Sequence, residues 1–97
     1  MYAKVLRFDV GFGRPRLAEQ IASETEAAMS RFAGYDSLEL LADYLGGRYT
    51  LIAYWVTDRD YYNFSYSPAA EELEKTVDTL MTGVPYVGFY EVYQPRA

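Results

Sequence analysis

The segment from Tyr49 to Val56 constrains the fold most, because nearly all of its residues are apolar. Successive side chains of a β-strand point to opposite faces of the sheet. One face of this predicted strand therefore carries Tyr49, Leu51, Ala53 and Trp55. The opposite face carries Thr50, Ile52, Tyr54 and Val56. A strand that is apolar on both faces is expected to lie in a sheet that is covered on both sides.

The rest of the chain predicts two helical regions and three further strands around this one. The strands are expected at about residues 2–10, 37–44, 48–56 and 84–93, and the helices at about 15–33 and from 57 to 83, with a fresh start at Ser67-Pro68. Pro15 suits a first helical turn, and Gly34 and Gly83 suit helix ends. Thr57 and Ser67 suit helix N-caps. The order βαββαβ indicates an α+β, ferredoxin-like fold whose four-stranded antiparallel sheet has the order 4-1-3-2.

This order predicts a single domain, residues 1–97, that needs a partner. Both helical regions would cover the same face of the sheet. The uncovered face is expected to carry Ile52, Tyr54, Val56, Val5 and Leu41, together with Val87 and Phe89. Apolar patches of that size are unusual on monomers, so a homodimer that pairs two sheets is expected. The alternative is a moderately apolar sheet face that remains exposed to water. The charged residues of the same face, Arg7, Asp9, Glu39 and Asp43, would keep part of it hydrated.

Charge and composition exclude several classes of function. Nine basic and fourteen acidic residues give a net charge of −5. This disfavours nucleic acids and anionic membrane surfaces as partners, because both require a basic face. No apolar run of about 18 residues and no signal peptide is found, so a cytoplasmic protein is expected. The chain has no Cys and no His, so a metal site is not expected.

The candidate binding residues are aromatic, because 18% of the chain is Phe, Trp or Tyr. They are Trp55, Tyr49, Tyr61, Tyr62, Phe64 and Tyr66, with the amide of Asn63 among them. Trp55 is either a flat pocket wall or a core anchor. Some of the tyrosines are expected to pack in the core, and Asn63 either binds a substrate oxygen or is exposed. Glu71, Glu72, Glu74 and Asp78 are interpreted as a solvated helix face.

Four segments resemble one known family. They are Leu51-Ile52-Ala53-Tyr54-Trp55-Val56-Thr57, the aromatics Tyr61 and Phe64 before Ser67-Pro68, Gly34-Tyr35-Asp36-Ser37, and Phe89-Tyr90-Glu91-Val92. They are similar to segments of the antibiotic biosynthesis monooxygenase family, whose members are dimeric α/β-barrel proteins. The resemblance implies a small aromatic or polyketide-like substrate, cofactor-independent oxygenation and a pocket at Trp55. Haem degradation is not expected, because Leu6 occupies the position of that branch's Asn and its His is missing.

Three hypotheses for the function remain open at this point. The first is a cofactor-independent monooxygenase or a related enzyme with a pocket between sheet and helices. Its catalytic residues are unknown, because without His the base would be a perturbed Asp, Glu or Tyr, or the substrate would be acidic by itself. The second is a non-catalytic dimeric domain that binds a small hydrophobic ligand. The third is an interaction domain without a cavity.

Overall fold

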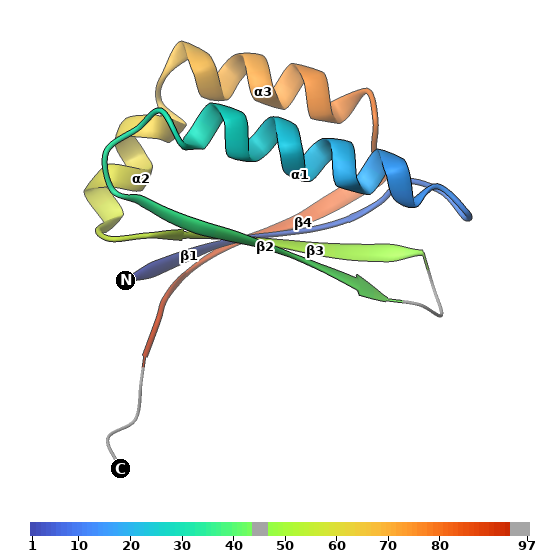
Figure 1. The fold of residues 1–97 in the computed structure, drawn as a ribbon, viewed down its shortest axis with the longest axis horizontal. Coiled ribbons are helices and arrows are strands. Elements are labelled where there is room, and N and C mark those ends of the chain that lie inside the picture. Colours follow the sequence, from blue (N-terminus) through green and yellow to red (C-terminus); the bar gives the residue numbers. More distant parts are fainter. Residues whose placement is uncertain (44–46, 94–97) are drawn as a thin grey trace.

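The computed structural model describes residues 1–43 and 47–93 as one sheet with three helices (Figure 1). The elements are β1 (Tyr2–Asp9), α1 (Pro15–Met29), β2 (Tyr35–Asp43), β3 (Arg48–Trp55), α2 (Asp58–Ser65), α3 (Pro68–Asp78) and β4 (Thr82–Glu91). The strand order is β2-β3-β1-β4, and every pairing is antiparallel. The predicted fold and strand order are therefore confirmed.

All three helices lie on one side of the sheet (Figure 1). Helices α1 and α3 run side by side above the strands, and α2 lies beyond the end of β3. The fresh start predicted at Ser67 is real, since its side chain accepts a hydrogen bond from the backbone N–H of Ala70. Thr57 caps α2 in the same way, through the N–H of Asp60. These two caps divide the second helical region into α2 and α3.

Two helices are shorter than predicted. Helix α1 ends at Met29 instead of about residue 33, because the chain turns there through a hydrogen bond from Phe32 N–H to the Met29 carbonyl. Helix α3 ends at Asp78, where the N–H groups of Leu80 and Met81 share the Val77 carbonyl. Gly83, predicted as the helix end, lies in β4. The predicted Gly46-Gly47 turn and the end of the second strand at Tyr44 fall partly outside the described residues.

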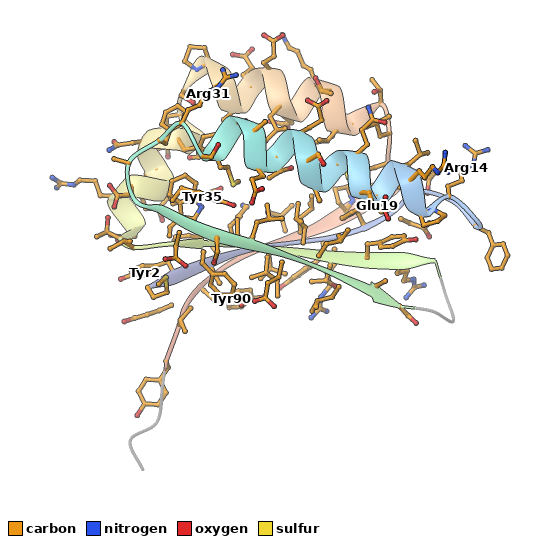
Figure 2. The ribbon with its side chains drawn as sticks, in the orientation of Figure 1. Tyr2, Arg14, Glu19, Arg31, Tyr35 and Tyr90 are labelled. Carbon is orange, nitrogen blue, oxygen red and sulfur yellow. The ribbon has the colours of Figure 1, made fainter. Side chains whose placement is uncertain are left out.

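The prediction that Val87 and Phe89 lie on the uncovered face was wrong. Val87 pairs with Leu6 and Phe89 with Lys4, and both pairs point toward the helices. Tyr86, Gly88 and Tyr90 occupy the uncovered face instead, and Figure 2 shows Tyr90 on the side away from the helices. The side chains of a strand alternate strictly, so a single change of register moves all of them to the other face.

The core lies between the sheet and the helices in two clusters. The first contains Phe8, Val10, Ala18, Ile21, Leu51 and Val77. The second contains Met29, Ala53, Trp55, Tyr61 and Phe64. No helix among the described residues is both long and apolar enough to cross a membrane.

Candidate functional site

A cavity of about 340 Å³ lies between the sheet and the helix layer. This is near the lower end of the range of ligand sites in proteins, roughly 300–1,000 Å³, and therefore suits a small ligand. Its floor is formed by side chains of β1 and β3, and its roof by side chains of α1, α2 and α3. The apolar wall residues are Leu6, Leu51, Ala53, Met29, Tyr61, Phe64, Ala70, Leu73, Val77, Met81, Pro85 and Val87.

The cavity opens along the edge strand β4. Helix α3 packs on α1 rather than on β4, and Pro85 and Val87 of β4 line the cavity at this edge of the sheet. Val87 lies at this opening, because its side chain faces the helix layer and lines the cavity and yet is 51% exposed. Small side chains at Ala53 and Ala70 enlarge the space at floor and roof. The sequence thus folds into a groove that is apolar inside and accessible from the sheet edge.

Two of the predicted site residues, Tyr61 and Phe64, border this cavity. They lie three residues apart in α2, so they share the helix face that points toward the sheet. Both are buried, and the Tyr61 ring stacks on Phe89 at a centroid distance of 4.6 Å. The aromatic end of the cavity therefore has well-packed walls.

Trp55 is fully buried directly behind these two rings. Its ring stacks on Phe64 at 5.7 Å and meets Tyr61 edge-on at 5.9 Å. Tyr35 covers a third side, edge-on at 5.7 Å. The indole Nε1 has no hydrogen-bond partner within the described part of the chain. Trp55 is not among the residues that line the cavity, so it supports the wall from the core side.

The structure does not bring the other four predicted residues into the cavity. Tyr49 stacks on Phe8 at 5.7 Å and lines a hollow at the opposite end of the sheet. Tyr62 of α2 and Tyr66, the residue that follows this helix, are exposed and stack on each other at 6.3 Å. Asn63 is also exposed on that helix. None of these four side chains lines the cavity.

Three charged residues at the cavity were not predicted as site residues. Lys4 projects from β1, and its Nζ lies 5.3 Å from the centre of the Tyr61 ring. Glu74 and Asp78 reach the cavity from α3, although both were interpreted as part of a solvated face. A signal for Lys4 existed in the sequence, since it is the only charge among the alternate β1 positions Tyr2, Lys4, Leu6 and Phe8.

The tyrosine beside Trp55 is held in its protonated form. Burial, together with the hydrogen bond that the Tyr35 hydroxyl donates to Glu26 at 2.9 Å, raises the pKa of Tyr35 well above its usual value. Figure 2 shows Tyr35 on the helix side of the sheet. Its phenol is therefore not a base at neutral pH. Among the described residues, no three carboxylates come close enough together to hold a metal ion.

No family profile matches the chain, and no curated protein matches its sequence. Solved structures do match its fold over nearly the whole length. SnoaB from Streptomyces nogalater, a cofactor-independent oxygenase, has a TM-score of 0.81 at 23% identity, covering 97% of this chain and 94% of its own. The ActVA-Orf6 monooxygenase of Streptomyces coelicolor, in complex with nanaomycin D, has a TM-score of 0.82 at 21% identity, covering 99% and 90%.

A third match carries the name of the family that segments of this sequence resemble. It is a candidate antibiotic biosynthesis monooxygenase from Bordetella bronchiseptica, with a TM-score of 0.79 at 21% identity, covering 96% of this chain and 97% of its own. At this level of identity the likeness concerns the fold. The chain therefore has the fold of the antibiotic biosynthesis monooxygenases over nearly its entire length.

Proposed function

We propose that this protein is a cofactor-independent monooxygenase that acts on a small aromatic, polyketide-like molecule bound in the cavity. The observation that carries the proposal is the apolar cavity between the sheet and the helices. It occurs in a fold that SnoaB, a cofactor-independent oxygenase, and ActVA-Orf6, solved with nanaomycin D, also adopt. Planar rings fit between the Tyr61–Phe64 wall and the aliphatic floor at Leu6 and Leu51.

The chemistry requires a substrate that readily forms an anion. Its ionised carbon can pass electrons to O2 and form a C–O bond. A methylene group and O2 then give a carbonyl group and water, so no external reductant is consumed. The protein's contribution is to exclude water from the rings and to stabilise the anion. In this proposal Glu74 or Asp78, the two carboxylates that line the cavity, would accept the proton.

A substitution at the cavity mouth tests this proposal. We expect Val87→Trp to fill the opening and lower the rate of O2-dependent oxidation of an anthrone to its anthraquinone at least about tenfold. The reaction is followed by anthraquinone absorbance against the uncatalysed rate, and ¹⁸O2 should place one labelled atom in the product. Val84→Trp is the matched control, because Val84 is 97% exposed on the same strand and does not line the cavity.

The second candidate function is ligand binding without catalysis. It is favoured by one observation: Glu74 and Asp78, the carboxylates that line the cavity, are both exposed, so the cavity holds no buried carboxylate. Anthrone binding that Val87→Trp abolishes, with no turnover above the uncatalysed rate, would establish this alternative. Catalysed oxidation that is equally fast in the wild type and in Val87→Trp, or anthrone binding that Val87→Trp leaves unchanged, would contradict the cavity as the site of either function.

The homodimer also remains a proposal, and the uncovered sheet face supports it. That face carries Val5, Leu41, Ile52, Tyr54, Val56, Tyr86 and Tyr90. Its phenols already have partners within the chain. A hydrogen bond to Glu39 raises the pKa of Tyr54, and Tyr86 hydrogen-bonds to Tyr90. Their rings can therefore be buried by a second copy without leaving a hydroxyl unpaired.

We expect light scattering after size exclusion to give twice the chain mass of 11.1 kDa. Ile52→Asp should yield a monomer, because Ile52 lies in the middle of the uncovered face and a buried, unpaired carboxylate is unfavourable there. Ser23→Asp adds the same charge on the exposed side of α1 and should remain dimeric. A monomeric wild type at micromolar concentration would contradict pairing through the sheet.

A further inference from the structure

Lys4 is the only basic side chain among the residues that line the cavity. It lies on β1 between Ala53 of β3 and Phe89 of β4, on the face toward the helices. The residue is only partly exposed, and its ammonium group lies over the Tyr61 ring. No carboxylate of the described residues is recorded within 4.0 Å of its Nζ, and the ion pair that is present joins Lys75 to Glu71.

Packing alone does not explain why this position carries a lysine. Drawing an ammonium group out of water is unfavourable unless a partner compensates its charge. The ring face of Tyr61 compensates part of it through a cation–π contact. A methionine would fill the same space without a charge. The positive charge is therefore better explained by a ligand than by packing.

The charges are arranged unevenly along the cavity. Lys4 lies at the α2 end, beside Tyr61, whereas the two carboxylates, Glu74 and Asp78, reach the cavity from the later half of α3, which leads toward Met81 and Pro85. An anionic group would therefore be attracted to the α2 end and repelled from the other. The apolar walls between these ends would bury the rings of the same molecule. The arrangement thus gives a bound molecule a single preferred direction.

We propose that Lys4 is the group that recognises an anionic oxygen of the ligand, a carboxylate or an ionised enol or phenol on a planar aromatic molecule. This inference rests on the proposed function, because it uses the same cavity, and it adds the ligand class and the ligand's orientation. The ammonium group would donate a charge-assisted hydrogen bond to the anionic oxygen. In an oxygenation reaction it would also stabilise the substrate anion, so Lys4 would be a substrate-binding residue in contact with the reacting system.

Two probes of the same shape test the proposal by calorimetry: 2-naphthoate, which is anionic, and 2-naphthalenemethanol, which is neutral. We expect the wild type to bind naphthoate at least about tenfold more tightly than the alcohol. Lys4→Met should remove this preference while leaving affinity for the alcohol nearly unchanged, and Lys4→Arg should retain it. Lys75→Met is the matched control, since it removes one exposed lysine from α3 and should keep the wild-type preference.

The possible results separate this inference from the proposed function. Equal affinities of the wild type for the two probes, or an unchanged preference in Lys4→Met, would overturn the role of Lys4 and leave the cavity as an aromatic site. Binding of neither probe would overturn both proposals. Val87→Trp should weaken the binding of both probes alike, and binding that survives this substitution would place them outside the cavity and overturn the assignment of Lys4.

Discussion

Replacing Trp55 with alanine should lower the free energy of unfolding by roughly 3–5 kcal/mol, the usual cost of emptying a large buried aromatic site. Trp55 is fully buried, and the rings of Tyr35, Tyr61 and Phe64 pack on three sides of it. A ring that bordered a cavity would leave a smaller void and cost less. The structure supports the larger value, because Trp55 does not line the cavity.

Chemical denaturation followed by circular dichroism measures this effect, since the variant lacks the chain's single Trp. Tyr66→Ala is the control, because Tyr66 is an 86% exposed aromatic residue of the same region and should cost about 0.5 kcal/mol or less. Trp55→Phe extends the test if the alanine variant is too unstable to measure. It loses no hydrogen bond, because Nε1 has no partner in the described chain. A loss below roughly 1.5 kcal/mol for Trp55→Ala would contradict core packing.

The architecture could be predicted from the sequence because its signals are redundant. The apolar segment 48–56 indicates a central strand, and the structure places β3 between β2 and β1. The caps at Thr57 and Ser67 mark where helices begin, and both form the expected side-chain hydrogen bonds. Each local preference agrees with the overall fold, which is typical of sequences that specify a single structure.

The faces of β4 could not be predicted in the same way. Its pairing with β1 is irregular between Arg7 and Asp9, where Tyr86 and Thr82 are the partners. The irregularity sets an even number of residues against an even number, so it keeps the alternation of faces and does not account for the wrong assignment. Both faces of β4 carry large apolar or aromatic side chains, Val87 and Phe89 on one and Tyr86 and Tyr90 on the other, so the hydrophobic pattern alone does not say which set meets the helices. The cavity was consequently not recognisable as a groove that opens at the edge strand.

The site was predicted only where its residues share a helix face. Tyr61 and Phe64 are three residues apart and point inward together, whereas Tyr62 and Tyr66 are four apart and stack outward. Helical spacing predicts both pairs, but it does not say which pair faces the sheet. Which pair faces the sheet depends on how α2 packs against it. Lys4 was missed for a related reason, because its role depends on Tyr61, which is distant in sequence.

Gly34→Ala should destabilise the protein by roughly 1.5–4 kcal/mol, because two independent costs add at this position. Gly34 has φ +86°, a left-handed conformation that costs a side-chain-bearing residue roughly 1–2 kcal/mol. A Cβ there would also overlap the Asp60 side chain from its own Cβ to its carboxylate. Because Asp60 is overlapped close to the backbone, a change of its rotamer cannot relieve the clash, and α2 has to shift.

The shift would disturb a junction that holds β2, β3 and α2 together. Asp60 N–H donates to the Thr57 hydroxyl at 3.1 Å, and this hydroxyl donates to the Asp60 carboxylate at 2.8 Å. The Gly34 carbonyl accepts a hydrogen bond from Val56 N–H at 2.8 Å. Loss of a helix N-cap alone costs roughly 0.5–2 kcal/mol. The strain therefore acts on the segment that leads from Trp55 into the helix with the aromatic cavity wall.

Two comparisons separate the backbone cost from the overlap with Asp60. Gly13 has a similar φ of +75° and no atom within 4 Å of its Cβ position, so Gly13→Ala should cost only roughly 1–2 kcal/mol. In an Asp60→Gly background the overlap is gone, and Gly34→Ala should then cost no more than Gly13→Ala. Denaturant unfolding of the wild type, Gly34→Ala, Asp60→Gly and the double variant gives the coupling energy between positions 34 and 60. A coupling near zero would show that Asp60 moves aside freely and that the left-handed backbone accounts for the whole effect.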